Sequence, residues 1–288
     1  MTLRVGTRGS ALALAQARTV ADALGGELVA ITTTGDRERA ALDKERWVRE
    51  LDAALLAGEI DVAVHSAKDV PALLHPGIAI VATPARASAL DALCGASSLD
   101  ALEPGARVGT SSLRRTAQLR ALREDLDVRE LRGNVDTRLR RLAQGDYEAI
   151  VLARAGLERL GRGAEATATL DELVPCAGQG VLAITARAGD AGAQAATRRL
   201  DDAGTGICLR AERALVRALG ADCHTPVGAH AQLEGHALRL RAFVGRTDGS
   251  AWIADELVRD DGARAPEAAG QAVAARLLTA GADEVLGR

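Results

Sequence analysis

The stretch LRVGTRGSALALAQARTVADAL, residues 3–24, contains the pattern that decides the fold. Its first five residues are typical of a buried strand. Ser10 can then cap a helix that ends at Leu24, because apolar residues recur there at helical spacing. The chain continues with a predicted strand over 28–32, a helix over 47–57 that closes at Gly58, and a strand over 60–64.

The same order recurs about a hundred residues later. Val108-Gly109-Thr110 repeats Val5-Gly6-Thr7, and Ser112 can cap a helix as Ser10 does. A strand over 128–131, a helix over 135–144 closing at Gly145, and a strand over 149–152 follow. Alternating strands and helices imply parallel sheets with right-handed crossovers. We therefore predict an α/β fold of two similar lobes, with mainly parallel sheets, helices on both faces, and ligands at the carboxyl ends of the strands.

The C-terminal part follows a different pattern. A helix over 207–219 precedes a hairpin of strands over 238–245 and 251–258, and Pro266 opens a last helix to about residue 280. These elements predict a small α+β domain, with Cys223 in the loop after its first helix.

Composition and charge exclude several classes of protein. The 288 residues are 48% apolar, which suits two or three domains, and the net charge of −3 gives no overall attraction to nucleic acid or an anionic membrane. Charged residues interrupt every apolar run, and the first residues lack a secretory pattern, so we expect a cytoplasmic protein. The four cysteines lack metal-site spacing, so we expect reduced thiols and no metal.

Arginine is concentrated at predicted strand ends and helix starts. The segment 107–159 holds 12 arginines and no lysine, and Arg114 and Arg115 fall in the first turn after Ser112. Cations there oppose the helix dipole unless an anion is bound, although a solvated helix face explains them equally well. Phosphate-loop motifs are absent. The arginines therefore point to a ligand with several carboxylates or phosphates.

Two further segments have both a functional and a structural interpretation. Asp69 and Lys68 directly follow the strand over 60–64, and Lys68 is one of only two lysines in the chain. Asp69 is either a functional carboxylate or a turn cap before Pro71. Cys223 is either a nucleophile or attachment point, or an inert buried residue.

Seven motifs occur in order along nearly the whole chain. They are Val5-Gly6-Thr7-Arg8-x-Ser10, His65-Ser66-Ala67-Lys68-Asp69-Val70-Pro71, Gly109-Thr110-Ser111-Ser112-Leu113-Arg114-Arg115, Leu131-Arg132-Gly133-Asn134-Val135-x-Thr137-Arg138-Leu139, Ala155-Gly156-Leu157-x-Arg159-Leu160, Gly178-Gln179-Gly180 and Cys223-x-x-Pro226-Val227-Gly228. Together they make the chain resemble the porphobilinogen deaminases.

The resemblance implies a transferase that joins four porphobilinogen molecules into hydroxymethylbilane, on a dipyrromethane cofactor held by a thioether to Cys223. Asp69, with Lys68, would be catalytic. The implied cofactor-binding residues are Cys223, Ser66, Lys68, Asp69, Thr110, Ser112, Arg114, Arg115 and Arg132. The implied substrate-binding residues are Arg8, Ser10, Arg138, Arg159 and Gln179, with Arg86 less closely matched. The substrate is a small molecule, and we expect a monomer.

The resemblance also implies a domain arrangement with two lobes of periplasmic-binding-protein type. Domain 1 would comprise 1–84 and 181–199, domain 2 would comprise 88–175, and the third domain would comprise 204–288. Hinges near 84–88 and 175–180 would let the molecule open as the product chain lengthens.

The chain departs from the family pattern in a few places. The segment 36–46 is short and highly charged where the family has a glycine-rich lid, so Lys44 and Trp47 would be its lid residues. Leu90 and Thr185 stand where charged residues are expected. A non-catalytic anion-binding protein of the same two-lobed fold is the alternative, and it needs neither Cys223 nor the pair Lys68 and Asp69. A degenerate homologue with an impaired lid is a third hypothesis.

Overall fold

The chain divides into two compact units, each built from two separate segments. The computed structural model describes residues 2–31, 44–222 and 224–288, with the backbone alone for 44–47. Unit 1 comprises Met1–Ala87 and Val181–Ile207, and unit 2 comprises Ser88–Gly180 and Cys208–Arg288. A third domain over 204–288, and hinges near 84–88 and 175–180, stay predictions.

Unit 1 contains a five-stranded sheet in the order β2-β1-β3-β10-β4. The strands are β1 (Arg4–Arg8), β2 (Glu27–Ile31), β3 (Val62–Ser66), β4 (Ile78–Ala82) and β10 (Leu182–Arg187). Strand β1 is parallel to both β2 and β3, whereas β10 is antiparallel to β3 and β4. Four strands therefore run in one direction, as a mainly parallel sheet requires, and the carboxyl ends of β1 and β3 lie at the same edge.

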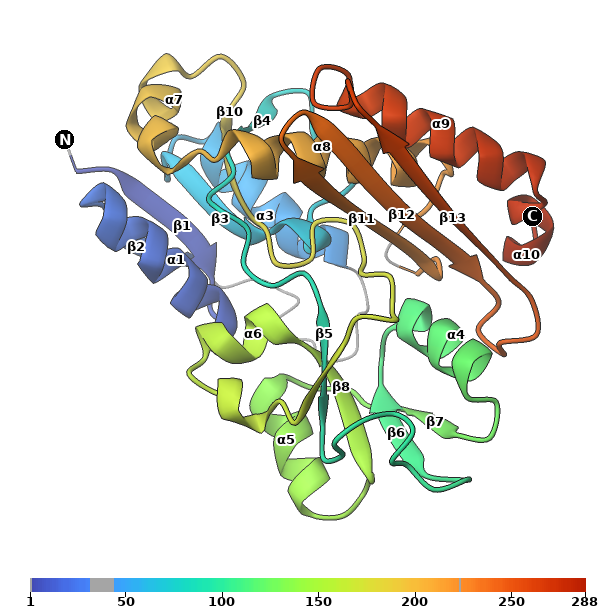
Figure 1. The fold of residues 1–288 in the computed structure, drawn as a ribbon. Helices are drawn as coiled ribbons and strands as arrows, with labels where there is room; N and C mark the ends of the chain where they lie inside the picture. The colour runs from blue at the N-terminus through green and yellow to red at the C-terminus, as the bar shows by residue number, and fades with distance from the viewer. Residues whose placement is uncertain (1, 32–43, 223) are drawn as a thin grey trace. The chain divides into compact units, whose positions relative to one another are not determined.

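Helices cover both faces of this sheet. Helices α1 (Ala11–Leu24) and α7 (Ala191–Thr197) pack on the face that presents Val62 and Val64. Helix α3 (Lys44–Leu56) packs on the opposite face, which presents Ala63. Figure 1 shows α1 beside β1. The single turns η1 (Ala67–Asp69) and η3 (Arg198–Leu200) follow β3 and α7.

Unit 2 repeats the arrangement with a sheet in the order β7-β6-β8-β5-β9. The strands are β5 (Asp91–Cys94), β6 (Arg107–Thr110), β7 (Asp127–Glu130), β8 (Ala149–Ala153) and β9 (Ala168–Leu170). Strand β6 is parallel to β7 and β8, and β5 is antiparallel to β8 and β9. The duplication predicted from the sequence is thus confirmed at the level of strand order and direction.

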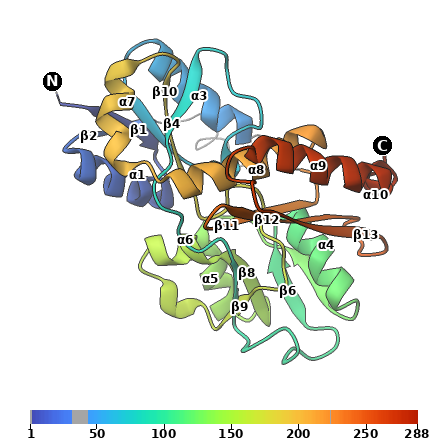
Figure 2. The ribbon, with the colours of Figure 1, turned by 45° about the horizontal axis from the view of Figure 1, so that its top comes forward.

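The helices of unit 2 again lie on both faces of its sheet. Helix α4 (Leu113–Leu122) packs on one face through Leu119, in a cluster with Val108. Helices α5 (Val135–Ala143) and α6 (Arg154–Arg159) pack on the other face through Leu139 and Leu157. Figure 2 shows α5 and α6 beside β8. The turn η2 (Gly163–Glu165) follows α6.

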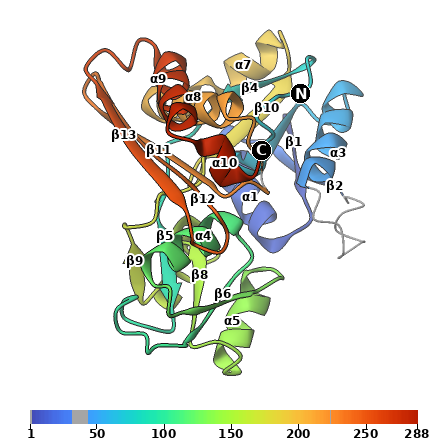
Figure 3. The same ribbon diagram turned by 90° about the vertical axis from the view of Figure 1, so that its right-hand side faces the viewer.

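The C-terminal part has the predicted α+β character. Helix α8 (Ala203–Ala218) precedes an antiparallel sheet of β11 (Val227–Glu234), β12 (Ala237–Gly245) and β13 (Trp252–Arg259), and helices α9 (Pro266–Thr279) and α10 (Ala282–Leu286) end the chain. Figure 3 shows α9 and α10 beside this sheet. Helix α9 approaches α8 closely at Gly270, where a Cβ atom would lie 2.2 Å from the carbonyl oxygen of Ala211.

Eight elements were not predicted from the sequence, namely β4, β5, β9, β10, β11, α6, α7 and α10. Three of these strands have only three to five residues, and short apolar runs do not distinguish strands from other buried segments. Strand β11 has the sequence VGAHAQLE, which contains a single β-branched residue. Within the described ranges, none of the helices combines the length and the apolar character needed to cross a membrane.

Candidate active site

A small cavity of about 60 Å³ in unit 1 brings together four of the predicted site residues. Arg8 ends β1, Ser10 caps α1, Ser66 ends β3, and Asp69 lies in η1. These residues come from two segments that are almost sixty positions apart. They meet because β1 and β3 are parallel neighbours, whose carboxyl ends share one edge of the sheet.

Gln16 lines the same cavity and was missed by the sequence reasoning. Its Nε2 lies 2.9 Å from the Ser66 Oγ, and its side chain is almost completely buried on α1. The Gln16–Ser66 contact ties the helix to the end of β3. The sequence did contain a signal for it. Gln16 places a side-chain amide on the helix face that otherwise presents Ala13, Ala17 and Val20 to the core.

His65 precedes this segment and is held in its neutral form. Its Nε2 lies 3.0 Å from the Thr185 Oγ1, and both side chains are buried. Burial lowers the pKa of His65 to about 4, against the opposing effect of the Asp69 charge and with a further lowering by Arg8. Thr185, which stands where the family pattern has a charge, therefore supplies a neutral hydroxyl to a neutral imidazole.

Lys68 and Asp69 occupy the turn η1 directly after β3. The amide N–H of Ala67 at the start of the turn donates to the Val181 carbonyl at 2.9 Å, which holds the turn against the segment before β10. Lys68 and Asp69 are both half-buried. The amide N–H of Arg86, which matches the family pattern less closely, donates to the Thr205 Oγ1 at 3.0 Å.

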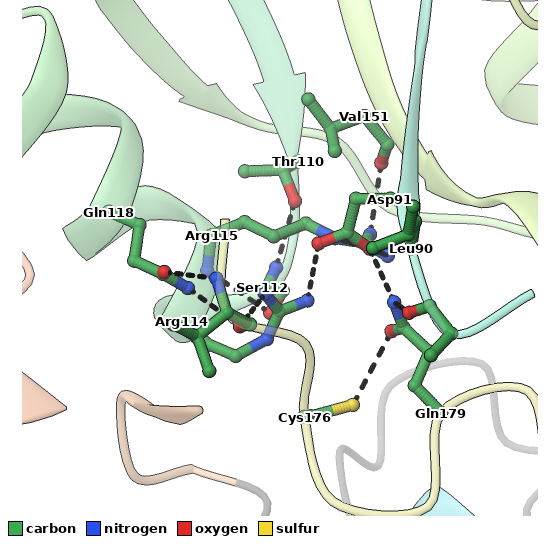
Figure 4. A network of polar contacts seen from close by, with 12 residues as sticks. Leu90, Asp91, Thr110, Ser112, Arg114, Arg115, Gln118, Val151, Cys176 and Gln179 are labelled. Atoms are coloured by element: carbon green, nitrogen blue, oxygen red, sulfur yellow. Dashed lines mark hydrogen bonds and ion pairs between the residues drawn. The ribbon is translucent and has the colours of Figure 1, made fainter. Parts of the chain in front are cut away.

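In unit 2, Arg114 and Arg115 share one buried carboxylate, that of Asp91 (Figure 4). Arg114 Nη2 donates to Asp91 Oδ2 at 2.8 Å, and Arg115 donates to Oδ1 from Nε at 3.1 Å and from Nη2 at 2.7 Å. Burial alone would raise the pKa of Asp91, but the two guanidinium groups hold it well below its usual range. The arginines are 3% and 6% exposed, so the interpretation as a solvated helix face was wrong.

Gln179, predicted to contact substrate, belongs to the same network. Its side chain is fully buried, and its Nε2 donates to Asp91 Oδ1 at 2.8 Å and to the Ala89 carbonyl at 2.6 Å. Its role in substrate binding stays a prediction. Sequence reasoning missed Asp91, although an acid at the start of the otherwise apolar strand DALC was a usable signal.

Arg138 and Arg159 differ from the buried pair because no carboxylate of the described chain forms an ion pair with either. Arg138 donates to the Ser111 Oγ at 2.9 Å and to the Gly133 carbonyl at 2.8 Å. Burial, and then the charge of Arg115, lower its pKa to about 10. Arg159 donates to the Gly180 carbonyl at 2.7 Å, and burial lowers its pKa while the charge of Glu158 opposes the shift.

Three other predicted residues lie at the carboxyl ends of β6 and β7. The Thr110 Oγ1 accepts from the amide of Ser112 at 3.2 Å, and the Ser112 Oγ accepts from the amide of Arg115 at 3.4 Å as the N-cap of α4. Arg132 is exposed and contacts the Glu130 carboxylate at 2.7 Å. The three predicted site residues therefore lie at this edge of the sheet. Part of their hydrogen-bonding capacity is already used by contacts within the chain.

Some predicted site residues lie outside what the structure describes. These are Cys223, most of the segment 36–46, and the side chains of Lys44 and Trp47. Their roles in cofactor attachment and as a lid stay predictions. Among the described residues, no three His, Cys, Asp or Glu side chains are placed to hold a metal ion. Cys94, Cys176 and Cys208 are not joined in disulfides.

The fold and these sites define an α/β protein with a group of arginines after the strands of one sheet. The chain belongs to the porphobilinogen deaminase family. Residues 3–195 match the porphobilinogen deaminase, dipyromethane cofactor binding domain, and residues 206–279 match the porphobilinogen deaminase, C-terminal domain.

Several curated relatives are each named porphobilinogen deaminase. The relative from Stenotrophomonas maltophilia is 47% identical over 99% of both chains, and the one from Rubrobacter xylanophilus is 47% identical over 99% of this chain and 96% of its own. A Roseiflexus relative is 50% identical over 86% of this chain and 87% of its own. Among solved structures, the second substrate binding domain of a putative amino acid ABC transporter from Streptococcus pneumoniae covers 69% of this chain and 93% of its own, with 13% identity and a TM-score of 0.42.

Proposed function

We propose that this chain joins four porphobilinogen molecules into hydroxymethylbilane, on a dipyrromethane primer held by a thioether to Cys223. Membership of the family makes the chain a transferase of tetrapyrrole biosynthesis with a dipyrromethane cofactor. The further proposals are that Cys223 is the attachment point, that the enzyme is a monomer, and that it works in the cytoplasm.

The observation that carries the proposal is the cavity shared by Arg8, Ser10, Ser66 and Asp69. It combines a carboxylate, a guanidinium and two hydroxyl groups at one sheet edge. The donors suit the acidic side chains of a pyrrole. The Asp69 carboxylate can accept pyrrole N–H groups and stabilise the positive charge that develops on the ring nitrogen as ammonia leaves. Lys68, the next residue, adds a cation for an acidic substituent.

The arginines of unit 2 fit the same ligand class. Arg138 and Arg159 are desolvated cations that form no ion pair with a carboxylate in the described ranges, and a bound carboxylate would supply the missing counter-charge. The cofactor and substrate both carry acetate and propionate groups. We assign Arg138 and Arg159 to substrate carboxylates, and Thr110, Ser112, Arg114, Arg115 and Arg132 to those of the cofactor.

The intact mass of the denatured, purified protein tests the proposal directly. We expect the parent to carry an adduct of two deaminated porphobilinogen units, and we expect Cys223→Ser to lack it. Cys176→Ser is the matched control, because serine keeps a donor at this half-buried position, where the Cys176 Sγ donates to the Gln179 Oε1 at 3.5 Å. It should keep the adduct. Incubation with porphobilinogen should then add further pyrrole units to the parent and to Cys176→Ser.

One outcome would replace the proposal with its alternative. If the parent has an unmodified mass and porphobilinogen adds nothing to it, the chain is a non-catalytic anion-binding protein. An adduct that survives in Cys223→Ser but disappears in Cys176→Ser would move the attachment point and leave the rest of the proposal in place.

A further inference from the structure

Asp91 is a fully buried carboxylate at the start of β5, outside the set of residues that the proposed function uses. It lies 23 and 24 positions before Arg114 and Arg115. It reaches them because β5 and α4 belong to the same sheet-and-helix layer of unit 2, whose shared core includes Leu93 and Leu119. Figure 4 shows its two oxygens between the two guanidinium groups. Its contacts therefore depend on the fold rather than on sequence proximity.

Each guanidinium group is held by two partners, the Asp91 carboxylate and one backbone carbonyl. Arg114 bonds Asp91 through Nη2 and donates from Nη1 to the Val174 carbonyl at 2.7 Å. Arg115 bonds Asp91 through Nε and Nη2 and donates from Nη1 to the Val151 carbonyl at 3.0 Å. A guanidinium group has five N–H donors, so each arginine keeps donors beyond these contacts. Both side chains are thus held in one orientation before any ligand binds.

Charge explains why a single carboxylate matters here. Two adjacent buried guanidinium groups repel each other, and the cost of burying them falls when a carboxylate lies between them. Asp91 neutralises one of the two charges and leaves a net positive charge for an acidic ligand. Arg115 also lowers the pKa of Arg138, which indicates that the surplus charge is felt by the neighbouring arginine.

The network continues from Asp91 into the segment that carries Gly178-Gln179-Gly180. Gln179 donates to Asp91, and the amide of Gly178 donates at 2.7 Å to Glu212, a fully buried carboxylate of α8. The other oxygen of Glu212 accepts from the amide of Ala231 in β11 at 2.8 Å. Asp91 is therefore the point where the arginine pair joins a chain of buried polar contacts within unit 2.

We propose that Asp91 is a positioning residue, which holds Arg114 and Arg115 in the orientation that receives the carboxylates of the cofactor. This inference rests on the proposed function, because it assigns the arginine pair to the cofactor. It predicts that cofactor loading and substrate binding respond differently to the loss of Asp91. Loss of the Asp91 charge reduces the loading of the cofactor. Substrate binding by loaded molecules stays unchanged, because Arg138 and Arg159 remain in place and Gln179 keeps its bond to the Ala89 carbonyl.

The test is Asp91→Asn, which keeps the shape of the side chain and removes its charge. The measurements are the loaded fraction by intact mass, and kcat and KM for porphobilinogen on the folded protein. We expect the loaded fraction, and with it kcat per total enzyme, to fall by about tenfold or more, because a buried charge pair loses one partner. The KM of the remaining activity should stay within about twofold of the parent value, since a twofold change is well under 1.4 kcal/mol.

Leu126→Ala provides the control for a general loss of stability. Leu126 is a buried core residue of the same unit, in a cluster that includes neither arginine. We expect it to lower the Tm and to leave the loaded fraction of the folded protein unchanged. If Asp91→Asn and Leu126→Ala lower the Tm alike and both load fully, Asp91 has only a structural role and the proposal fails.

Asp91→Glu keeps the test decisive if Asp91→Asn does not fold. It retains the charge and displaces the carboxylate by one methylene group, so it should fold and still load less cofactor than the parent. Full loading of Asp91→Glu with an unchanged rate of loading would overturn the proposal. A parent that carries no adduct would instead contradict the proposed function itself, so the two failures are distinguishable.

Discussion

At the scale of single residues, the arginines of unit 2 fall into two groups that the sequence did not separate. Arg114 and Arg115 already share the carboxylate of Asp91, whereas Arg138 and Arg159 form ion pairs with no acid that the structure describes. A cation without a counter-charge in a desolvated place is costly for the free protein, and it is stabilised by an acidic ligand. The second group should therefore control binding of the substrate.

Replacing Arg138 by glutamine tests this assignment. We expect Arg138→Gln to raise the KM for porphobilinogen by about 10- to 100-fold, because a hydrogen bond to a charged group contributes about 1.5–3 kcal/mol. The loaded fraction should not change. The Tm should stay the same or rise, since burial and Arg115 already disfavour this charge in the free protein.

Arg140→Gln is the matched control for Arg138→Gln, because Arg140 is an exposed arginine on the same helix, α5. It should leave both kcat and KM unchanged. Equal KM values for Arg138→Gln and the parent would remove Arg138 from the substrate site. A KM that rises equally in both variants would indicate a general electrostatic effect.

The buried His65 makes a prediction about stability and pH. Its pKa is about 4 in the folded protein, against 6.5 for an ordinary histidine. Between these values the unfolded chain binds a proton that the folded protein does not. The stability is therefore complete above about pH 6.5 and is lost as the pH falls toward 4, by about 3 kcal/mol in total.

Urea unfolding between pH 4 and 7.5 measures this loss. We expect the slope of the unfolding free energy against pH to decrease in His65→Gln, whose side chain does not titrate. His75→Gln, at an exposed position in the same unit, should keep the parent slope. An unchanged slope in His65→Gln would show that other groups cause the pH dependence.

The residues that sequence reasoning found and missed have a common physical explanation. Arg8, Ser10 and Asp69 follow predicted strands, so their position at a sheet edge could be foreseen. Asp91 and Gln16 act through partners that are distant in the sequence, and those contacts exist only once the sheets are formed. The burial of Arg114 and Arg115 was unforeseen for the same reason, since it depends on Asp91.

At the scale of elements, the two copies of the strand–turn–helix begin in the same way. Ser10 caps α1 by accepting from the amide of Ala13 at 3.3 Å, and Ser112 caps α4 by accepting from the amide of Arg115 at 3.4 Å. The cap signal was readable because serine before a helical pattern satisfies an otherwise free amide. Ser112 was also assigned to the cofactor, so its two roles need to be separated.

Two substitutions at Ser112 separate the roles. Ser112→Ala removes the cap and should lower the unfolding free energy by about 1 kcal/mol, whereas Ser112→Asn keeps a cap and should change it by only a few tenths. Ser10→Ala measures the cost of losing the equivalent cap in unit 1. If Ser112→Asn is as stable as the parent and still loads poorly, Ser112 contacts the cofactor. Full loading would make it a cap alone.

Helices were predictable where helical periodicity, an N-cap residue and a glycine after the last residue occurred together. Helix α1 shows all three, with Ser10 at its start and Gly25, at a φ of 65°, after its end. Strand β5 is antiparallel to β8, and β10 is antiparallel to β3. Neither strand belongs to the strand–helix pattern that the sequence repeats. Their places depend on pairing between distant segments, so local patterns in the sequence cannot supply them.

At the scale of the whole molecule, a net charge of −3 coexists with a local excess of positive charge in the segment 107–159. Several acidic residues of unit 2 are already paired with other arginines, as in Arg123–Asp125 and Arg107–Glu148. Repulsion from Arg115 adds to the effect of burial in lowering the pKa of Arg138 in the free protein. An acidic ligand relieves that repulsion and should stabilise the folded chain.

This argument predicts a difference in salt dependence between the loaded and the free protein. Salt screens repulsion between charges near the surface, so the Tm of Cys223→Ser should rise between low salt and about 0.15 M, where the screening length is about 8 Å. The loaded parent should have the higher Tm at low salt and a smaller response, because carboxylates of the cofactor already neutralise the arginines. Arg138→Gln in the Cys223→Ser background should also respond less. Equal salt responses in all three proteins would mean that the arginines of this segment store no significant repulsion, and that the cofactor stabilises the fold by packing.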